Sequence, residues 1–274
     1  MLIIKDIDEL KRARASMEGS VGFVPTMGAL HPGHLSLIQR AKKENERVIV
    51  SIFVNPTQFL EGEDLEKYPK KEEADLKICK HAGVDVVFMP DAMMMYAKDE
   101  MSIIAPQVRG YLLEGEKRPG HFDGVLRVVL KLLNLTRPWK AYFGKKDAQQ
   151  LALIQSMVQD YFLDTVIVPC DIVRDSDGLA LSSRNVYLSG EEKTQALSLS
   201  RSLRIATKMI SSGERNIKTI RDAMIDELSQ YIKIDYVAIV DRKFQNIEQI
   251  IIGDTIILVA GFVGATRLID NIQV

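Results

Sequence analysis

Short apolar runs and longer amphipathic stretches alternate along the first two thirds of the chain. The short runs predict strands, and they lie at 20–25, 47–54, 84–89, 140–143 and 165–169. The longer stretches have apolar residues at helical spacing and predict helices that begin near 34, 70, 122 and 148. The run 47–54 is apolar at nearly every position, which is typical of a parallel strand covered on both faces. The pattern therefore predicts an α/β fold with a Rossmann-like, doubly wound parallel sheet.

The pattern changes after the sequence Asp175-Ser-Asp-Gly178. Ser189 and Glu192 form a capping-box motif, which predicts the start of a helix that runs to about Ser211. A second helix is predicted over 217–231. The segments 234–240 and 255–269 alternate like strands joined by Gly-containing turns, which predicts a small antiparallel sheet. We therefore expect a Rossmann-like domain at 1–176 and a smaller C-terminal α+β domain at 177–274.

Charge and composition narrow the class of partner. The 274 residues carry 36 Lys and Arg against 37 Asp and Glu, so the chain has no basic surplus for nucleic acid or an anionic membrane. The longest nearly apolar stretch, 256–265, is about half of the roughly 20 residues that cross a bilayer. The N-terminus lacks the features of a signal peptide, and two cysteines are too few for a disulfide framework. We expect a cytoplasmic protein with a small-molecule ligand, and we expect Trp139 in the core.

The first candidate site is the sequence Pro25-Thr-Met-Gly-Ala-Leu-His-Pro-Gly-His34, between the first long strand and its helix. A helix N-terminus in this place binds phosphate, and His31 and His34 would add donors to an anion. The motif matches neither a dinucleotide-binding fingerprint nor a P-loop. Two alternatives stay open: a tight turn with incidental histidines, and a zinc site, for which the only further histidines are His81 and His121.

A second candidate follows the strand 47–54, where Asn55 and Gln58 would direct amides toward a small polar acid at the carboxyl edge of the sheet. The alternative is an Asn-Pro turn whose amides face solvent. A Gly-rich loop with Lys117, Arg118 and His121 precedes a predicted helix and also suits an anion.

Two further stretches have the composition of phosphate-binding segments. In the first, Lys145 and Lys146 could approach a triphosphate, and Asp147 could cap the next helix or hold a hydroxyl group or a metal ion. In the second, Ser182, Ser183 and Arg184 could clamp phosphate. A solvated lysine pair and a serine-rich linker are the alternatives.

Five motifs in this order carry a family resemblance. They are 25–34, Phe53-Val-Asn-Pro-Thr-Gln-Phe59, Arg118-Pro-Gly-His-Phe122, the stretch 143–150 and Leu181-Ser-Ser-Arg-Asn185. From Gly22 to about Asn271 the chain resembles the pantothenate synthetase (pantoate–β-alanine ligase) family of the HIGH-signature nucleotidylyltransferase superfamily. One departure is that Ala74 precedes Asp75 where the family often has an adjacent acidic pair.

The resemblance implies roles for individual residues. It implies that His31, His34, Lys146 and Arg184 are catalytic, and that Gln58, Gln150 and Asn55 bind substrate, with His121 and Arg118 in a loop that covers the site. The implied ATP-binding residues are Met27, Gly28, Ala29, Leu30, His31, Pro32, Gly33, His34, Gly144, Lys145, Lys146, Asp147, Val173, Leu181, Ser182, Ser183 and Arg184.

The resemblance also implies a reaction. (R)-Pantoate and Mg-ATP would form a pantoyl adenylate and pyrophosphate, and β-alanine would then displace AMP to give pantothenate. The cofactors implied are ATP and Mg²⁺, the state implied is a homodimer, and the C-terminal domain would act as a lid. A nucleotidyltransferase of the same superfamily that keeps the nucleotide on its product is the alternative, and a non-catalytic nucleotide sensor is another.

Overall fold

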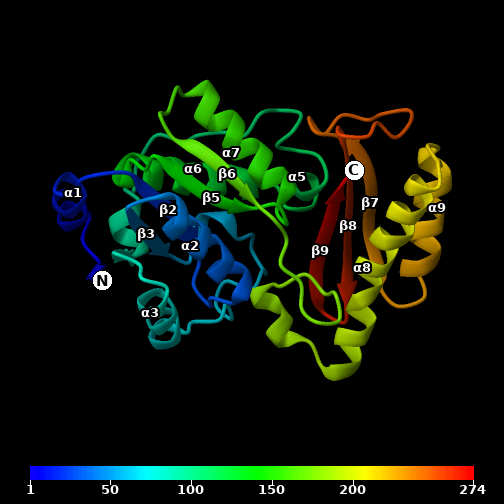
Figure 1. Ribbon diagram of the computed structural model, residues 1–274, viewed down its shortest axis with the longest axis horizontal. Coiled ribbons are helices and arrows are strands. Elements are labelled where there is room, and N and C mark those ends of the chain that lie inside the picture. The colour runs from blue at the N-terminus through cyan, green and yellow to red at the C-terminus, as the bar shows by residue number, and fades with distance from the viewer. The chain divides into compact units, whose positions relative to one another are not determined.

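The computed structural model describes residues 1–274 and separates into two compact units (Figure 1). The first unit contains Met1–Lys145 and Gln150–Asp171, and the second contains Lys146–Gln149 and Ile172–Val274. The expected domain boundary at 176/177 falls shortly after the end of the first unit.

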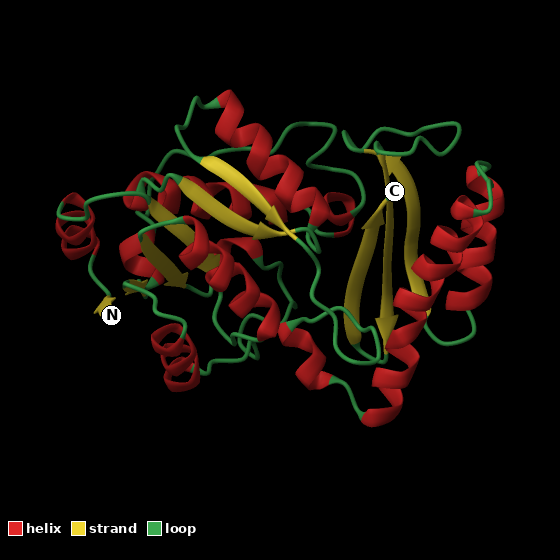
Figure 2. Ribbon diagram, viewed as in Figure 1, coloured by secondary structure: helices red, strands yellow, loops and turns green.

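The first unit is built on a six-stranded parallel sheet of order β1-β4-β3-β2-β5-β6 (Figure 2). Its strands are β1 (Leu2–Ile4), β2 (Val21–Thr26), β3 (Arg47–Ile52), β4 (Val86–Phe88), β5 (Lys140–Gly144) and β6 (Val166–Cys170). Its helices are α1 (Ile7–Ala15), α2 (Pro32–Glu44), α3 (Glu72–His81), α4 (Ala92–Met95), α5 (Glu114–Lys117), α6 (His121–Thr136) and α7 (Ala148–Asp160), with a 3-10 turn η1 (Pro56–Gln58). The predicted doubly wound α/β fold is confirmed.

Helices cover both faces of this sheet (Figure 1). Phe23 and Ile49 face one side, where α1, α6 and α7 contribute to the core, whereas their neighbours Val24 and Val50 face the other side with α2 and α3. Successive side chains of a strand point to opposite faces, so burial of both faces requires apolar residues at every position. This is why the run beginning at Arg47 is apolar nearly throughout.

The order of the strands reverses between β2 and β5. From β2 the chain builds outward to β3 and β4 on one side, and it later adds β5 and β6 on the other side. In open parallel sheets, ligands bind outside the carboxyl ends of the strands at such a reversal. The loops after β2, β3 and β5 are therefore the places to look for a site.

The second unit is a three-stranded antiparallel sheet packed against two helices. It contains η2 (Ser183–Tyr187), α8 (Gly190–Ser211), α9 (Ile217–Leu228), β7 (Lys233–Asp241), β8 (Thr255–Val263) and β9 (Thr266–Gln273). The capping box predicted at Ser189 and Glu192 starts α8 with both hydrogen bonds in place. None of the helices in either unit is both long and apolar enough to span a bilayer.

Some details differ from the predictions. Trp139, expected in the core, is 56% exposed. It lies just before the first residue of β5, where its side chain is outside the core. The helix predicted to run to 231 ends at Leu228, and the segments β1 and α1 were not predicted. By contrast, the strands predicted within 255–269 are present as β8 and β9, and the Gly-containing turn that joins them has Gly264 at a positive φ of 55°.

Candidate active site

The loop after β2 has an unusual backbone that a buried carboxylate holds in place. Gly28 and Ala29 both have positive φ, of 82° and 49°. In this arrangement, the N–H groups of Ala29 and Leu30 converge, and each donates to one oxygen of Asp75 at 2.8 Å. Such paired amides form an anion-binding nest. Here the anion in the nest belongs to the protein.

Asp75 lies on α3 and is almost completely buried. Burial raises the pKa of its carboxyl group, and the hydrogen bonds from Leu30 and Ala29 oppose that rise. Sequence reasoning noted the departure at Ala74 and Asp75 but did not identify this contact. A single acidic residue in a charged helix gives no local indication that it reaches a loop 46 positions earlier.

His31 and His34 form the N-terminal cap of α2. The His31 ring accepts a hydrogen bond at Nδ1 from the Gly33 N–H at 3.2 Å, and the His34 ring accepts one at Nδ1 from the His31 N–H at 3.4 Å. The ring centroids are 4.0 Å apart. A neutral imidazole that accepts at Nδ1 carries its proton on Nε2, so each ring has an Nε2–H donor at the positive end of the helix dipole. This arrangement suits a polyanion.

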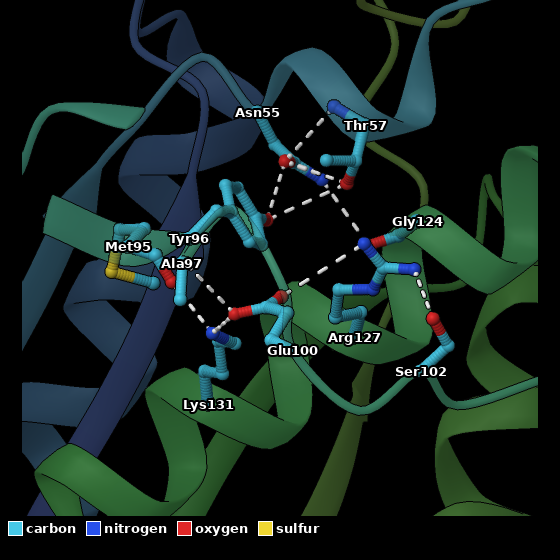
Figure 3. A network of polar contacts seen from close by, with 10 residues as sticks. All are labelled: Asn55, Thr57, Met95, Tyr96, Ala97, Glu100, Ser102, Gly124, Arg127 and Lys131. Carbon is cyan, nitrogen blue, oxygen red and sulfur yellow. Dashed lines mark hydrogen bonds and ion pairs between the residues drawn. The ribbon is translucent and has the colours of Figure 1, made fainter. Parts of the chain in front are cut away.

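The turn after β3 places Asn55 and Gln58 side by side. Asn55 is 1% exposed, and its Nδ2 donates to Gln58 Oε1 at 3.1 Å and to the Gly124 carbonyl at 3.2 Å. Figure 3 shows the Asn55 amide with Thr57, Tyr96 and Gly124. The Gln58 amide Nε2 in turn contacts the Met27 sulfur at 3.0 Å. The structure thus joins the predicted residues of the β2 and β3 loops, and these amides do not face open solvent.

Arg118 and His121 contact the main chain of Gln58. The Gln58 carbonyl accepts from His121 Nδ1 at 2.7 Å and from Arg118 at 3.3 Å. Arg118 also donates to His121 Nε2 at 3.0 Å and forms a two-pronged ion pair with Glu63 at 2.6 and 2.7 Å. This loop therefore pairs its cation with a carboxylate of the protein, which sequence reasoning did not foresee.

Arg118 affects the pKa of its two titratable partners, His121 and Glu63. Burial, together with the Arg118 charge, lowers the pKa of His121 to about 4, so the ring is neutral near pH 7. The pKa of Glu63 is lowered, because its hydrogen bonds and ion pair with Arg118 outweigh the effect of burial.

Gly124 lets the β3 turn approach the backbone of α6. A Cβ at this position would collide with the Thr57 carbonyl and with the Gln58 nitrogen. A larger residue cannot fit, so the absence of a side chain helps to define where Gln58 lies.

The strands β5 and β6 end in a further pair of charged residues. Lys145 follows Gly144 and forms an ion pair with Asp171 at 2.5 Å, which lowers the pKa of Asp171. Gln150 is half-buried in the first turn of α7. The structure gives these residues positions on the carboxyl side of the first unit's sheet.

The remaining predicted ATP residues belong to the second unit. The Leu181 N–H donates to the Val173 carbonyl at 3.0 Å, and the Ser182 hydroxyl accepts from the Arg184 N–H at 3.3 Å, so these predicted residues form one folded segment around η2. The carbonyl of Lys146 accepts from Asn271 on β9 at 2.7 Å, and Lys146 Nζ lies 4.0 Å from Asp147. The structure contains no group of three or more His, Cys, Asp or Glu side chains that could hold a metal ion.

Comparisons with known proteins agree on one family. The sequence model of the family described as pantoate-beta-alanine ligase matches residues 2–273. The pantothenate synthetase of Campylobacter curvus is 58% identical over 274 residues, the full length of both chains. The crystal structure of pantothenate synthetase from Thermus thermophilus aligns with a TM-score of 0.94 at 40% identity and covers 100% of this chain and 99% of that one.

A third relative was solved with ligands. The pantoate-beta-alanine ligase of Francisella tularensis, complexed with beta-gamma ATP and beta-alanine, aligns with a TM-score of 0.83 at 37% identity. The alignment covers 100% of this chain and 97% of that one. With matches over the full length in both sequence and structure, the chain belongs to the pantoate-beta-alanine ligase family.

Proposed function

We propose that the chain, an ATP-dependent ligase of pantoate and β-alanine by family, works through a pantoyl adenylate. In the first step, a carboxylate oxygen of (R)-pantoate attacks the α-phosphorus of ATP. A P–O bond forms, the bond to the bridging oxygen breaks, and pyrophosphate leaves. In the second step, the β-alanine amine attacks the acyl carbon, a C–N bond forms, the C–O bond to AMP breaks, and the amine loses a proton.

The observation that carries this proposal is the pair of Nε2–H donors at the start of α2. The α-phosphate gains negative charge as it becomes pentacovalent, and donors fixed in advance stabilise that charge without reorganisation. His31 and His34 are fixed by backbone hydrogen bonds at their other ring nitrogen. We therefore assign them to the ATP phosphates.

The rest of the ATP site is assigned by the family resemblance. Lys146 and Arg184 would contact the triphosphate, with help from the other predicted residues of the second unit. The N–H groups of Ala29 and Leu30 already bind Asp75, so these two residues act by shaping the loop. Magnesium enters with the triphosphate, as part of the substrate MgATP.

Pantoate would be bound by amides. Gln58 and Gln150 are the proposed contacts, and Gln58 has its Nε2 donor on the side of Met27, in the loop that leads to the histidines. Asn55, Arg118 and His121 act through Gln58, since each of them bonds either to its side chain or to its carbonyl.

No covalent intermediate with the protein is needed. Burial raises the pKa of Cys79 to about 12, and burial also raises the pKa of Cys170, so both thiols stay protonated near pH 7 and are poor nucleophiles. Because mixed anhydrides hydrolyse readily, a cover that excludes water would protect the adenylate, and we propose that role for the C-terminal domain.

An exchange assay tests the two-step order. With ATP and pantoate present and β-alanine absent, labelled pyrophosphate should enter ATP, because the adenylate forms before the amine is used. A strict requirement for β-alanine would refute the order. Release of free AMP in the complete reaction excludes the alternative in which the nucleotide stays on the product.

We also propose that the ligase is a cytoplasmic homodimer. The family resemblance carries this proposal. Sedimentation velocity at micromolar concentration should show twice the 30.8 kDa mass of one chain.

A further inference from the structure

The Asn55 amide has an orientation that the backbone determines. Its Oδ1 accepts from the Thr57 N–H at 3.3 Å, and its Nδ2 donates to the Gly124 carbonyl at 3.2 Å. A backbone N–H can only donate and a carbonyl can only accept, so the reversed amide would meet two groups of the wrong kind. The oxygen of Asn55 therefore points toward Thr57, and its NH₂ group points toward Gly124 and Gln58.

The orientation of the Asn55 amide determines that of the Gln58 amide. Since Asn55 Nδ2 is a donor, the Gln58 atom opposite it must be the acceptor Oε1, at 3.1 Å. The Gln58 Nε2 is then the end of the amide that lies toward Met27. The protein in this way fixes Gln58 as a donor toward its proposed ligand.

Tyr96 completes the coordination of Asn55 from outside the turn (Figure 3). Its hydroxyl donates to Asn55 Oδ1 at 2.6 Å, the shortest of the hydrogen bonds to that oxygen. Thr57 Oγ1 is a second hydroxyl donor, at 3.0 Å. Burial raises the pKa of Tyr96, so its phenol keeps the proton that it donates.

A second set of contacts holds Tyr96 in place. Lys131 lies over the Tyr96 ring, 5.0 Å from its centroid, and its Nζ donates to the Met95 carbonyl and to Glu100 Oε2, both at 2.6 Å. Arg127, one turn earlier on α6, donates to Ser102 and lies 3.9 Å from Glu100. Figure 3 shows these contacts fastening the segment 95–102 to α6. They restrict how far the Tyr96 hydroxyl can move from Asn55.

We propose that Tyr96 is a positioning residue for pantoate: its hydrogen bond holds Asn55, whose orientation the backbone sets, against the Gln58 amide, so that the Gln58 donor stays directed at the substrate's oxygen. The inference rests on the proposed role of Gln58. It also defines a specificity rule, because the group bound at Gln58 Nε2 must be an acceptor, such as a carboxylate or hydroxyl oxygen.

Tyr96→Phe removes only the hydroxyl group and is the central test. One neutral hydrogen bond in such a relay corresponds to about a three- to tenfold effect, so the pantoate KM should rise by that factor while the ATP KM stays within about twofold. The matched control is Tyr142→Phe, which removes a buried hydroxyl that bonds Asn45 and Glu44 on the other face of the sheet. It should lower thermal stability without changing the pantoate KM.

A double-mutant cycle separates a relay from a general loosening of the fold. If Tyr96 acts through Gln58, Tyr96→Phe should have no further effect on the pantoate KM once Gln58→Ala is present. Additive effects of the two substitutions, or an unchanged pantoate KM in Tyr96→Phe alone, would overturn the inference and leave the proposed function intact. If Gln58→Ala itself leaves the pantoate KM unchanged, the Gln58 assignment and this inference both fall, while pyrophosphate exchange still reports on the adenylate independently.

Discussion

Asp75 is the residue whose replacement tests the proposed phosphate loop most directly. Asp75→Asn keeps the size and shape of the side chain but turns one of its two acceptors into an NH₂ group. That donor would face the N–H of either Ala29 or Leu30, both of which need an acceptor at 2.8 Å. One of the two hydrogen bonds is lost, and the other becomes a bond to a neutral group.

The size of the effect follows from these contacts. A hydrogen bond to a charged group contributes about 1.5–3 kcal/mol, so the free energy of unfolding should fall by roughly that amount. The left-handed backbone of Ala29 costs about 1–2 kcal/mol that the carboxylate helps to offset. Once the carboxylate is gone, the loop can relax out of this conformation, and His31 moves with it. The ATP KM should therefore rise at least about tenfold, which corresponds to about 1.4 kcal/mol, whereas the pantoate KM changes less.

The assay combines steady-state kinetics with urea unfolding. Trp139 is the only tryptophan and belongs to the first unit, so its fluorescence reports the unfolding of the unit that contains Asp75. Glu73→Gln is the matched control, since it removes one acidic charge from the exposed side of the first turn of α3.

A rescue variant makes this prediction stricter. Ala29→Gly removes the left-handed strain of about 1–2 kcal/mol and adds about 0.5–1 kcal/mol of backbone entropy, so it should return roughly 0.5–1 kcal/mol to Asp75→Asn. The reasoning is refuted if Asp75→Asn matches Glu73→Gln in both unfolding free energy and ATP KM.

Four further predictions concern single residues of the site. The pKa of His121 is lowered from 6.5 to about 4, so between these pH values the unfolded chain binds a proton that the folded protein does not. The free energy of unfolding should therefore fall by about 3 kcal/mol as the pH falls from 6.5 to 4, and the same urea titration of His121→Asn should lack this loss. His34→Ala should lower kcat by about 10²–10³, the usual cost of removing one donor to a developing oxyanion, and a loss below about tenfold would remove His34 from the reaction. Gln58→Glu should raise the pantoate KM more than about tenfold, because a like charge replaces a donor facing a carboxylate, and an equal rise in the ATP KM would contradict the assignment. Gly124→Ala should lower the free energy of unfolding in urea by about 1–3 kcal/mol, because the added Cβ overpacks against Thr57. Gly190→Ala, which has open space at its Cβ, should be neutral or slightly stabilising in the same assay.

The central part of the fold could be predicted because its local pattern is unambiguous. The strands β2, β3 and β5 are largely apolar runs, and α6 has an apolar spacing that continues over 16 residues. The segments β1 and α1 escaped prediction, since β1 has only three residues and α1 is mostly charged, with Leu10 as its one buried residue. Trp139 was misplaced because the size and apolarity of a side chain do not reveal at which end of a strand it lies.

The candidate site likewise has a part that could be predicted from the sequence and a part that could not. The histidine cap and the Asn55 turn are local motifs, so residues within a few positions specify their geometry. The partners that hold them in place, Asp75, Tyr96 and Glu63, lie on other elements and meet the site only through the tertiary fold. Their sequence neighbourhoods, a charged helix start, a methionine-rich segment and an acidic loop, give no indication of these contacts.

The pairing of β1 has a consequence for synthesis of the chain. β1 pairs only with β4, and α1 is anchored on α6, where Arg14 donates to the carbonyls of Thr136 and Arg137. Residues 2–15 therefore have no complete set of partners until more than a hundred further residues have been made, which takes about 6–24 s at roughly 5–20 residues per second. Until β4 has been made, Leu2, Ile3 and Ile4 are an unpaired apolar segment, which a chaperone could bind. Residues 2–15 thus fold onto the first unit only after β4 and α6 have been made, although they are translated before both elements.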